Sequence, residues 1–258
     1  MGSALDKYIE SRSAILSPAT VREYKRSRRC DLQSLMDKNI HDITQDMIQA
    51  LINEEAKSHS PKTVGNMHGL LSAVMKEHRP DFALNTTLPK KVRPKIYVPK
   101  DYEVKKIIQA VADTELEIPV LLTAFGPMRR SEICALDSDH VKGNTVHVEF
   151  AIVLNDNNEW VKKDTKSYAG NRYIEFPNFV ADKLQGITER IVSLNPAMIT
   201  NRFFDMLEKE EINHFRFHDL RHYCASIQHA FGLSVMRYAI IYIQRGKPKA
   251  VHPTKVKL

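Results

Sequence analysis

The sequence predicts a mainly α-helical protein with a small antiparallel β-sheet, organised as two domains. Apolar residues recur with the 3.6-residue period of a helix before residue 80 and again after residue 100. Near residue 145 the period changes to two, which is typical of strands. Between the two helical regions, residues 84–98 are rich in proline and basic residues, and a chain of 258 residues is long enough for two hydrophobic cores.

The first domain, residues 1–83, is predicted to be a bundle of four helices. Ser17-Pro18 and Ser60-Pro61 each place an N-cap serine before a proline at the first helical position, and Thr44 is a third N-cap. The apolar residues after these caps fall on one face of each helix, which predicts a compact core. We expect the helices at residues 4–14, at 18–37, after Thr44, and at 61–78.

Basic residues of this domain are candidates for binding double-stranded DNA. The net charge of +7 and a pI near 9.2 favour a polyanionic partner, nucleic acid first and an anionic membrane second. Five cations lie within residues 22–29, but a helix spreads them over several faces, so a solvated flank is the alternative. Cations, together with hydroxyls and amides nearby, would position the protein on phosphates. The predicted DNA-binding residues are Arg22, Lys25, Arg26, Arg29 and Lys62 of this domain, with Lys90, Lys91 and Arg93 of the segment that follows it.

Residues 84–98 are predicted to be a basic linker. Pro89, Pro94 and Pro99 are incompatible with a continuous helix, and four cations lie within residues 90–95. Such a segment suits either a connection that contacts DNA or an ordinary hydrated spacer between domains.

The second domain, residues 99–232, is predicted to combine helices with a few strands. Gly126-Pro127 marks a turn between two helices, and Asn155 to Asn158 form a polar turn between two strands. A lysine-rich loop at 162–171 precedes a third strand. We expect helices at 101–112, 116–125, 179–184 and 198–211, and strands near 146–150, from 160, and at 172–176.

Two short stretches of this domain carry the residues best suited to phosphate chemistry. His218 and Arg221 are three residues apart, so on a helix both project toward one point. Arginine offers a planar fork of donors to phosphate oxygens, and histidine changes its protonation near neutral pH. The turn after Gly126 presents Arg129 and a neighbouring arginine, and two guanidiniums on one phosphate would stabilise its transition state. A capped or solvated helix face is the alternative interpretation of the His218 pair.

The wording and order of these stretches resemble the tyrosine recombinase family, also called phage integrases. The motifs are G-x-M-R-R-S-E-I-x-x-L at residues 126–136 and, about ninety residues later, H-D-L-R-H-x-x-A-S at 218–226. The resemblance implies a SAM-like, four-helix core-binding domain at 1–83 and an α+β catalytic domain at 99–232. It also implies site-specific recombination of double-stranded DNA at attachment-type sites, with self-association on the DNA and with no metal or other cofactor.

The resemblance also implies roles for single residues. Arg129 and Arg221 would clamp the scissile phosphate, His218 would handle a proton, and Lys166 would protonate the leaving 5′ oxygen, with Lys163 as its reserve. Glu132 is either a surface acid of a helix or a buried partner that fixes an arginine.

The tail at residues 233–258 departs from the family pattern. The family continues with a histidine or tryptophan and then a nucleophilic tyrosine, whereas this tail is basic and offers only Tyr238 and Tyr242 at an unexpected spacing. We therefore predict DNA binding with impaired strand transfer. Two other functions remain open: a DNA-binding regulator without catalysis, and a metal-free ribonuclease that uses His218 and Lys166.

The cellular location is predicted from the lack of a membrane-spanning segment and of a secretion signal in this sequence. No run of eighteen apolar residues and no apolar leader is found, which favours a cytoplasmic, nucleoid-associated protein. The three cysteines have no metal-ligand spacing, and all three are predicted to be reduced thiols in the core.

Overall fold

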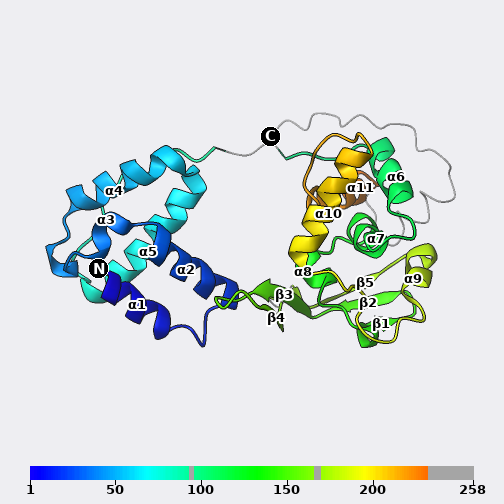
Figure 1. Cartoon of the computed structure of the whole chain (residues 1–258), viewed down its shortest axis with the longest axis horizontal. Helices are drawn as coiled ribbons and strands as arrows, with labels where there is room; N and C mark the ends of the chain where they lie inside the picture. The colour runs from blue at the N-terminus through cyan, green and yellow to red at the C-terminus, as the bar shows by residue number, and fades with distance from the viewer. Residues whose placement is uncertain (93–95, 166–169, 232–258) are drawn as a thin grey trace. The chain divides into compact units, whose positions relative to one another are not determined.

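The computed structural model describes residues 1–92, 96–165 and 170–231, which form two compact units (Figure 1). The first unit is Met1–Lys95 with Leu154–Glu159, and the second is Ile96–Val153 with the chain from Trp160 onward. The boundary between residues 95 and 96 falls inside the segment predicted to be a linker. Each unit has its own cluster of buried apolar side chains, so each has a separate core.

Up to residue 92, the regular elements of the first unit are all helices. Ser60 Oγ accepts a hydrogen bond from the Thr63 amide at 3.2 Å, and Thr44 caps its helix in the same way through the Met47 amide at 3.3 Å. These side chains satisfy amides that have no partner within the helix. The elements are α1 (Gly2–Glu10), α2 (Pro18–Cys30), α3 (Gln33–Met36), the 3-10 turn η1 (Ile40–Asp42), α4 (Gln45–Ser58) and α5 (Pro61–His78).

The predicted helix at 18–37 is in fact two helices, because the chain breaks at Leu32. Leu32 has a φ of 58° and a fully buried side chain, and its amide donates to Glu55 Oε1 at 3.0 Å. A continuous helix cannot contain this left-handed residue. The buried carboxylate of Asp31 pairs with Arg26 at 2.9 Å beside the break. Burial of the Leu32 side chain and the hydrogen bond from its amide to Glu55 therefore stabilise the break between the two helices.

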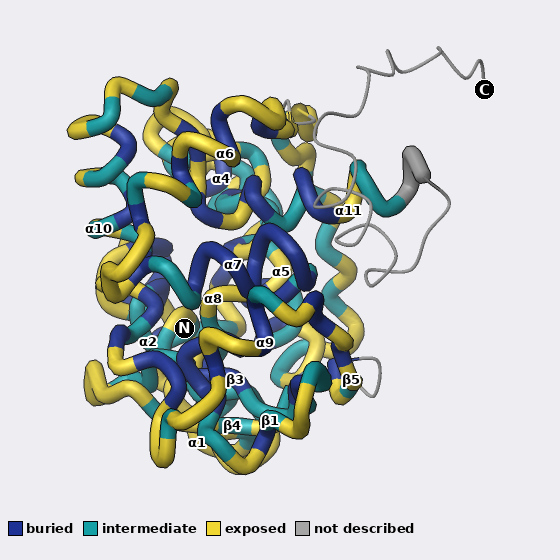
Figure 2. The backbone as a smooth tube through the Cα atoms, turned by 90° about the vertical axis from the view of Figure 1, so that its right-hand side faces the viewer, coloured by how far each residue is buried: buried dark blue, intermediate teal, exposed yellow. Residues whose placement is uncertain are grey.

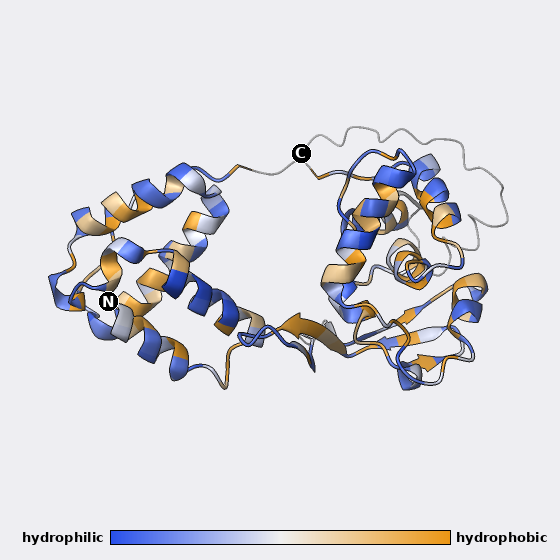
Figure 3. Ribbon diagram, in the orientation of Figure 1, coloured by the Kyte–Doolittle hydropathy of each residue, from blue (hydrophilic) through white to orange (hydrophobic). Residues whose placement is uncertain are grey.

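The second unit is built around α7 (Glu117–Phe125), whose residues from Pro119 to Phe125 are all buried (Figure 2). This helix lies against α9 (Asn178–Leu184) and α11 (Asp219–Phe231), and the Phe125 ring meets Phe179 edge-on. Figure 3 shows the apolar character of α7 as an orange ribbon. The remaining helices are α6 (Asp101–Ala110), α8 (Arg130–Ile133), the 3-10 turn η2 (Ser138–His140) and α10 (Pro196–Lys209).

The strands among the described residues form two small sheets. β1 (Val141–Lys142), β2 (Thr145–Val148) and β5 (Arg172–Glu175) form an antiparallel sheet in the order β1-β2-β5, with Val146 opposite Ile174. β3 (Phe150–Leu154) pairs with β4 (Trp160–Asp164). The predicted strand at 146–150 was wrong in its continuity, since the chain changes its strand partner at Glu149.

The expected fold class is confirmed: the protein is mainly helical with a small antiparallel sheet. Within the described ranges, no helix is long and apolar enough to cross a membrane. Cys134 and Cys224 are buried, and burial raises the pKa of each thiol to about 12, so both stay protonated and unreactive. The prediction of a core position was wrong for Cys30, which is exposed at the end of α2.

Gly126 joins α7 to the turn that carries Arg129, and its lack of a side chain is required by packing. A Cβ atom at this position would lie 2.3 Å from Cζ of Phe176, whose side chain is fully buried. We expect Gly126→Ala to destabilise the second unit by about 1–3 kcal/mol, because the ring has no room to move. Thermal unfolding measures this loss.

Gly65 is the matched control for this prediction. It lies within α5, and no atom stands within 4 Å of the position that a Cβ atom would take there. Gly65→Ala should be neutral or raise stability by up to about 1 kcal/mol. Equal melting temperatures for Gly126→Ala and the wild type would contradict the packing argument.

Candidate active site

Glu132 is a buried carboxylate that fixes the first arginine of the site. Arg129 is the N-cap residue of α8, and its amide donates to Glu132 Oε2 at 2.8 Å. The guanidinium of the same arginine donates through Nη1 to Oε1 at 2.6 Å. Glu132 is only 2 % exposed, whereas the Arg129 side chain is 52 % exposed. The interpretation of Glu132 as a surface acid was therefore wrong, and it is the buried partner of an arginine.

Arg172 of β5 approaches the same carboxylate from the sheet. Its Nη2 donates to Glu132 Oε2 at 2.8 Å and its Nη1 to Oε1 at 3.3 Å, and it also donates to the Gly170 and Pro127 carbonyls. Burial alone would raise the pKa of Glu132, but the hydrogen bonds from Arg172 and Arg129 outweigh burial and lower it. The carboxylate therefore stays ionised and ties the sheet to the turn after α7.

The segment before α11 repeats the arrangement seen at Arg129. The Arg216 amide donates to Asp219 Oδ2 at 2.9 Å, and Arg216 Nη2 donates to Oδ1 at 2.8 Å. Asp219 is 2 % exposed, so it is also a buried carboxylate three residues after its arginine. His218 lies between them and immediately precedes α11, and its carbonyl accepts a bond from the Arg221 amide at 3.1 Å. The predicted spacing of one turn between His218 and Arg221 is thus present, although His218 is outside the helix.

Arg221 is the second arginine of the site, and it has an unused donor. Its Nη1 atom is buried and has no hydrogen-bond partner among the described residues. Burial lowers the pKa of Arg221, and the positive charges of Arg129 and Arg172 lower it further, while Glu132 opposes them. These charges act on one another because they lie close together. Arg129, Glu132, Arg172 and Arg221, with the neighbouring His218, are called the cluster below. A buried guanidinium nitrogen without a partner is costly, and an anionic ligand would satisfy it.

His218 is exposed at the surface, yet its ring is partly desolvated by its surroundings. This desolvation lowers the pKa of His218 below the ordinary value of 6.5, and the neighbouring His222 and Arg221 lower it further. The rings of His218 and His222 meet edge-on with centroids 5.1 Å apart. His218 is therefore mainly neutral at pH 7, so its ring can accept a proton.

The state of His218 gives a direct prediction. In a proton NMR titration its imidazole should change protonation below pH 6.5, because desolvation and nearby cations disfavour the charged form. His222→Asn should raise the pKa of His218, since it removes a neighbouring ring that disfavours the charged form. A titration midpoint above 6.5 in the wild type would show that the site does not disfavour the imidazolium.

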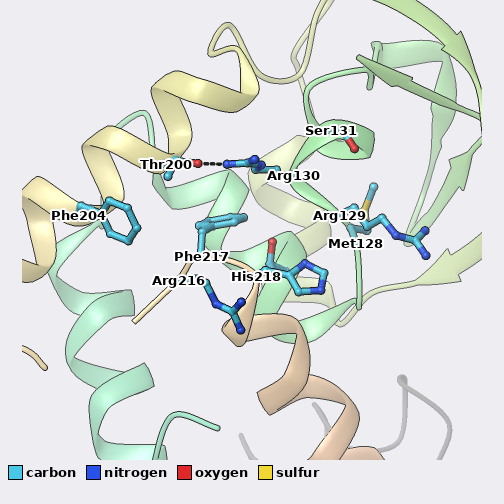
Figure 4. Close-up of a pocket in the computed structure, with 10 residues that line it drawn as sticks. Met128, Arg129, Arg130, Ser131, Thr200, Phe204, Arg216, Phe217 and His218 are labelled. Carbon is cyan, nitrogen blue, oxygen red and sulfur yellow. Dashed lines mark hydrogen bonds between the residues drawn. The ribbon is translucent and has the colours of Figure 1, made fainter. Parts of the chain in front are cut away.

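A cavity of about 450 Å³ adjoins the cluster (Figure 4). Its polar lining includes Arg129 and His218 of the cluster, together with Arg130, Thr200 and Arg216. Figure 4 shows Arg130 pointing toward Thr200 while Arg129 points to the opposite side. Its volume is within the range of small-ligand sites, and its charged lining is entirely basic.

The other predicted catalytic residues lie partly outside the described residues. Lys166 is one of these, as are Tyr238 and Tyr242 of the tail. Lys163 is described, and it is a half-buried residue of β4. Arg172 was not predicted as a site residue, although it stands directly after the lysine-rich loop, where a cation could have been noticed.

The predicted DNA-binding residues remain predictions. Arg22, Lys25 and Arg26 are half-buried on α2, where Arg26 pairs with Glu23 and Asp31. Figure 3 shows this helix as mostly hydrophilic. The exposed members of the set are Arg29, Lys62, Lys90 and Lys91, and Arg93 lies outside the described residues.

Comparison with known proteins shows what this chain is similar to. No protein-family model matches the sequence. No curated protein matches it either. Among solved structures, the Tn1549 transposon integrase in complex with a circular intermediate DNA has a TM-score of 0.73 at 17% identity, covering 94% of this chain and 90% of that chain.

Two structures of lambda integrase are also similar. A dimer bound to a COC′ core site has a TM-score of 0.65 at 17% identity, covering 99% of this chain and 98% of that chain. A tetramer bound to a Holliday junction has a TM-score of 0.67 at 17% identity, covering 92% of this chain and 76% of that chain. The chain therefore has the fold of these integrases, which is the fold of the tyrosine recombinases.

Proposed function

We propose that this protein is a site-specific DNA recombinase of the tyrosine type, an integrase, that acts on one phosphodiester through Arg129, His218 and Arg221. The observation that supports it most strongly is the buried Nη1 atom of Arg221, which lacks a partner among the described residues and lies in one cluster with Arg129. A phosphate oxygen would satisfy this donor, and the exposed side chain of Arg129 would reach the same phosphate.

The proposed chemistry follows from the state of each group. A tyrosine oxygen attacks phosphorus, a new O–P bond forms as the bond to the 5′ oxygen breaks, and the phosphodiester energy is kept in a phosphotyrosine. The two guanidiniums stabilise the negative charge that grows on the phosphate oxygens. Neutral His218 can accept a proton near the phosphate, and Lys166 is proposed to protonate the departing 5′ oxygen. No metal or other cofactor is required by this scheme.

The nucleophile is proposed to come from the tail. Tyr238 and Tyr242 are the candidates, and both lie closer to Arg221 in sequence than the family spacing predicts. We therefore expect strand cleavage to be slow, with DNA binding retained. Glu132 contributes by orienting Arg129 rather than by touching DNA, since it is 2 % exposed and bonded to two arginines.

Double-stranded DNA with attachment-type sites is the proposed partner. The similar integrases were solved with transposon, core-site and junction DNA, as a dimer in one case and a tetramer in another. We propose that this chain likewise associates with itself on DNA, and that it acts in the DNA-containing compartment of the cell. Residues 1–83 are proposed to be a core-type DNA-binding domain, 84–98 a basic linker, 99–232 the catalytic domain and 233–258 an atypical basic tail.

One assay tests this function. The protein first selects its binding site from a pool of random duplexes, and a nicked duplex carrying that site then traps any covalent intermediate. We expect a specific complex in gel-shift analysis and a slowly formed covalent adduct whose formation Arg221→Ala slows strongly. Binding with no adduct at any time would favour a DNA-binding regulator, and cleavage of RNA that depends on a 2′-hydroxyl would favour a ribonuclease. Failure to select any DNA would overturn the proposal.

A further inference from the structure

The cavity beside the cluster contains two arginines that the proposed chemistry does not use. Arg130 and Arg216 line it together with Thr200 and Ser131, and its lining includes no acidic side chain. The residues it shares with the candidate site are Arg129 and His218, so the cavity adjoins the place where the scissile phosphate is proposed to lie. An anion bound there would be a neighbour of that phosphate.

Arg130 is held in a direction that separates it from the scissile phosphate. Its Nη1 donates to Thr200 Oγ1, and the Thr200 hydroxyl donates in turn to the Pro196 carbonyl at 3.1 Å. Because the hydroxyl hydrogen is used in the bond to Pro196, the Thr200 oxygen serves as the acceptor that orients the Arg130 guanidinium. Figure 4 shows Arg129 pointing to the opposite side. Arg129 and Arg130 therefore cannot grip the same phosphate from their observed positions.

Arg216 is oriented on another wall of the cavity by Asp219. Its Nε and Nη2 atoms both donate to that carboxylate, at 3.3 and 2.8 Å. Among the described residues, Arg216 Nη1 makes no hydrogen bond, and the side chain is 63 % exposed. A guanidinium bound along one edge keeps donors on the other edge, and its planar fork fits phosphate oxygens.

We infer that this cavity is a second phosphate-binding site, in which Arg130 and Arg216 hold a phosphodiester next to the scissile one in the same DNA strand. The inference rests on the proposed function. Successive phosphates of one strand rise by about 3.4 Å along the duplex axis, so a strand held at one phosphate presents the next close by. Thr200 and Asp219 act as positioning residues, and the two arginines bind. Contacts of this kind set the register of the DNA and carry no sequence information.

Phosphate-by-phosphate substitution tests the inference. In the selected duplex, each phosphate near the nick is replaced in turn by an uncharged methylphosphonate, and the affinity of each variant protein is measured. For the wild type we expect an affinity loss of roughly tenfold at each contacted phosphate. Arg130→Ala and Arg216→Ala should each lose the sensitivity at one shared phosphate, because the contact is already missing.

The scissile phosphate gives the comparison that keeps the two proposals separate. Arg221→Ala should lose sensitivity at a different phosphate, one or two positions away on the same strand, while both cavity variants keep it. If Arg221→Ala loses no sensitivity, the proposed function fails and the cavity result still stands by itself. If Arg130→Ala or Arg216→Ala keeps the wild-type pattern at every phosphate, the second site is overturned.

Two controls complete the design. Arg202→Ala removes a partly exposed arginine of the same unit that pairs with Glu115 and does not line the cavity, so it should keep the whole wild-type pattern. The slope of log K against log salt concentration reports the number of phosphate contacts. Each cavity variant should reduce this slope by the amount expected for about one contact, and the double variant by that for about two. Arg130 is exposed, and among the described residues its side chain hydrogen-bonds only to Thr200, so Arg130→Ala keeps the test valid even if Arg216→Ala unfolds.

Discussion

Glu132→Ala is expected to destabilise the second unit by about 3 kcal/mol, the low end of the range for breaking a buried ion pair, because its arginines are partly solvated. The carboxylate is 2 % exposed and binds Arg129 and Arg172, so its removal leaves two guanidiniums without their acceptor. The single tryptophan, Trp160, belongs to this unit, and its fluorescence in a denaturant titration measures the loss.

Glu103 is the matched control for Glu132. It is also a carboxylate of 2 % exposure in the first turn of a helix, and it accepts from the Lys100 amide and the Tyr97 hydroxyl. Removal of Glu103 leaves only neutral donors without an acceptor. Glu103→Ala should therefore lower the free energy of unfolding by about 1–2 kcal/mol. Equal losses of unfolding free energy in the two variants would mean that the charge of the arginines adds nothing to the stabilisation by Glu132.

The same carboxylate predicts how stability depends on pH. The folded-state pKa of Glu132 is held below its ordinary value of 4.5, so its contribution is complete above pH 4.5 and disappears as pH falls through the lower, folded-state pKa. The difference in unfolding free energy between the wild type and Glu132→Gln should therefore narrow below pH 4.5. A difference that stays constant from pH 7 to pH 3 would contradict the ion-pair interpretation.

Arg221→Ala is expected to slow formation of the covalent adduct by about 10²- to 10³-fold, the loss typical of removing one donor from a developing oxyanion. It should not destabilise the fold, because its buried Nη1 atom lacks a partner in the described structure and costs about 1–3 kcal/mol there. The variant is thus predicted to melt at or above the wild-type temperature while losing its chemistry.

Two measurements distinguish this outcome from a structural role. Arg202→Ala serves as the control for charge, and it should cleave at the wild-type rate because it lies away from the cluster. Thermal melting of Arg221→Ala provides the second readout. A cleavage rate equal to the wild type, or a large fall in melting temperature, would show that Arg221 is not the phosphate ligand of the site.

The sequence predicted helix starts better than helix interruptions. The caps at Thr44 and Ser60 are local, and the structure confirms both through bonds to amides three residues later. The break at Leu32 depends on Glu55, a residue of another helix, so a local pattern could not reveal it. Likewise the change of strand partner at Glu149 is decided by pairing across the sheets.

For the candidate site, the motifs singled out Arg129 and Arg221 but did not reveal how their side chains are held. Arg129 and Arg221 stand about ninety residues apart in sequence, and only the fold places their charges in one cluster. The burial of Glu132 was left open because a four-residue helix has too few positions to define a buried face. Arg172 was missed since a single cation on a short strand is usually solvated.

The arrangement shared by Arg129 and Arg216 has a consequence for engineering. In each case one carboxylate, three residues further on, receives both the main-chain amide and the side chain of the arginine. The orientation of each guanidinium is thereby fixed by hydrogen bonds within four consecutive residues. Arg-x-x-Glu and Arg-x-x-Asp at a helix entrance are therefore transplantable units, able to present a directed cation on an unrelated scaffold that buries the acid.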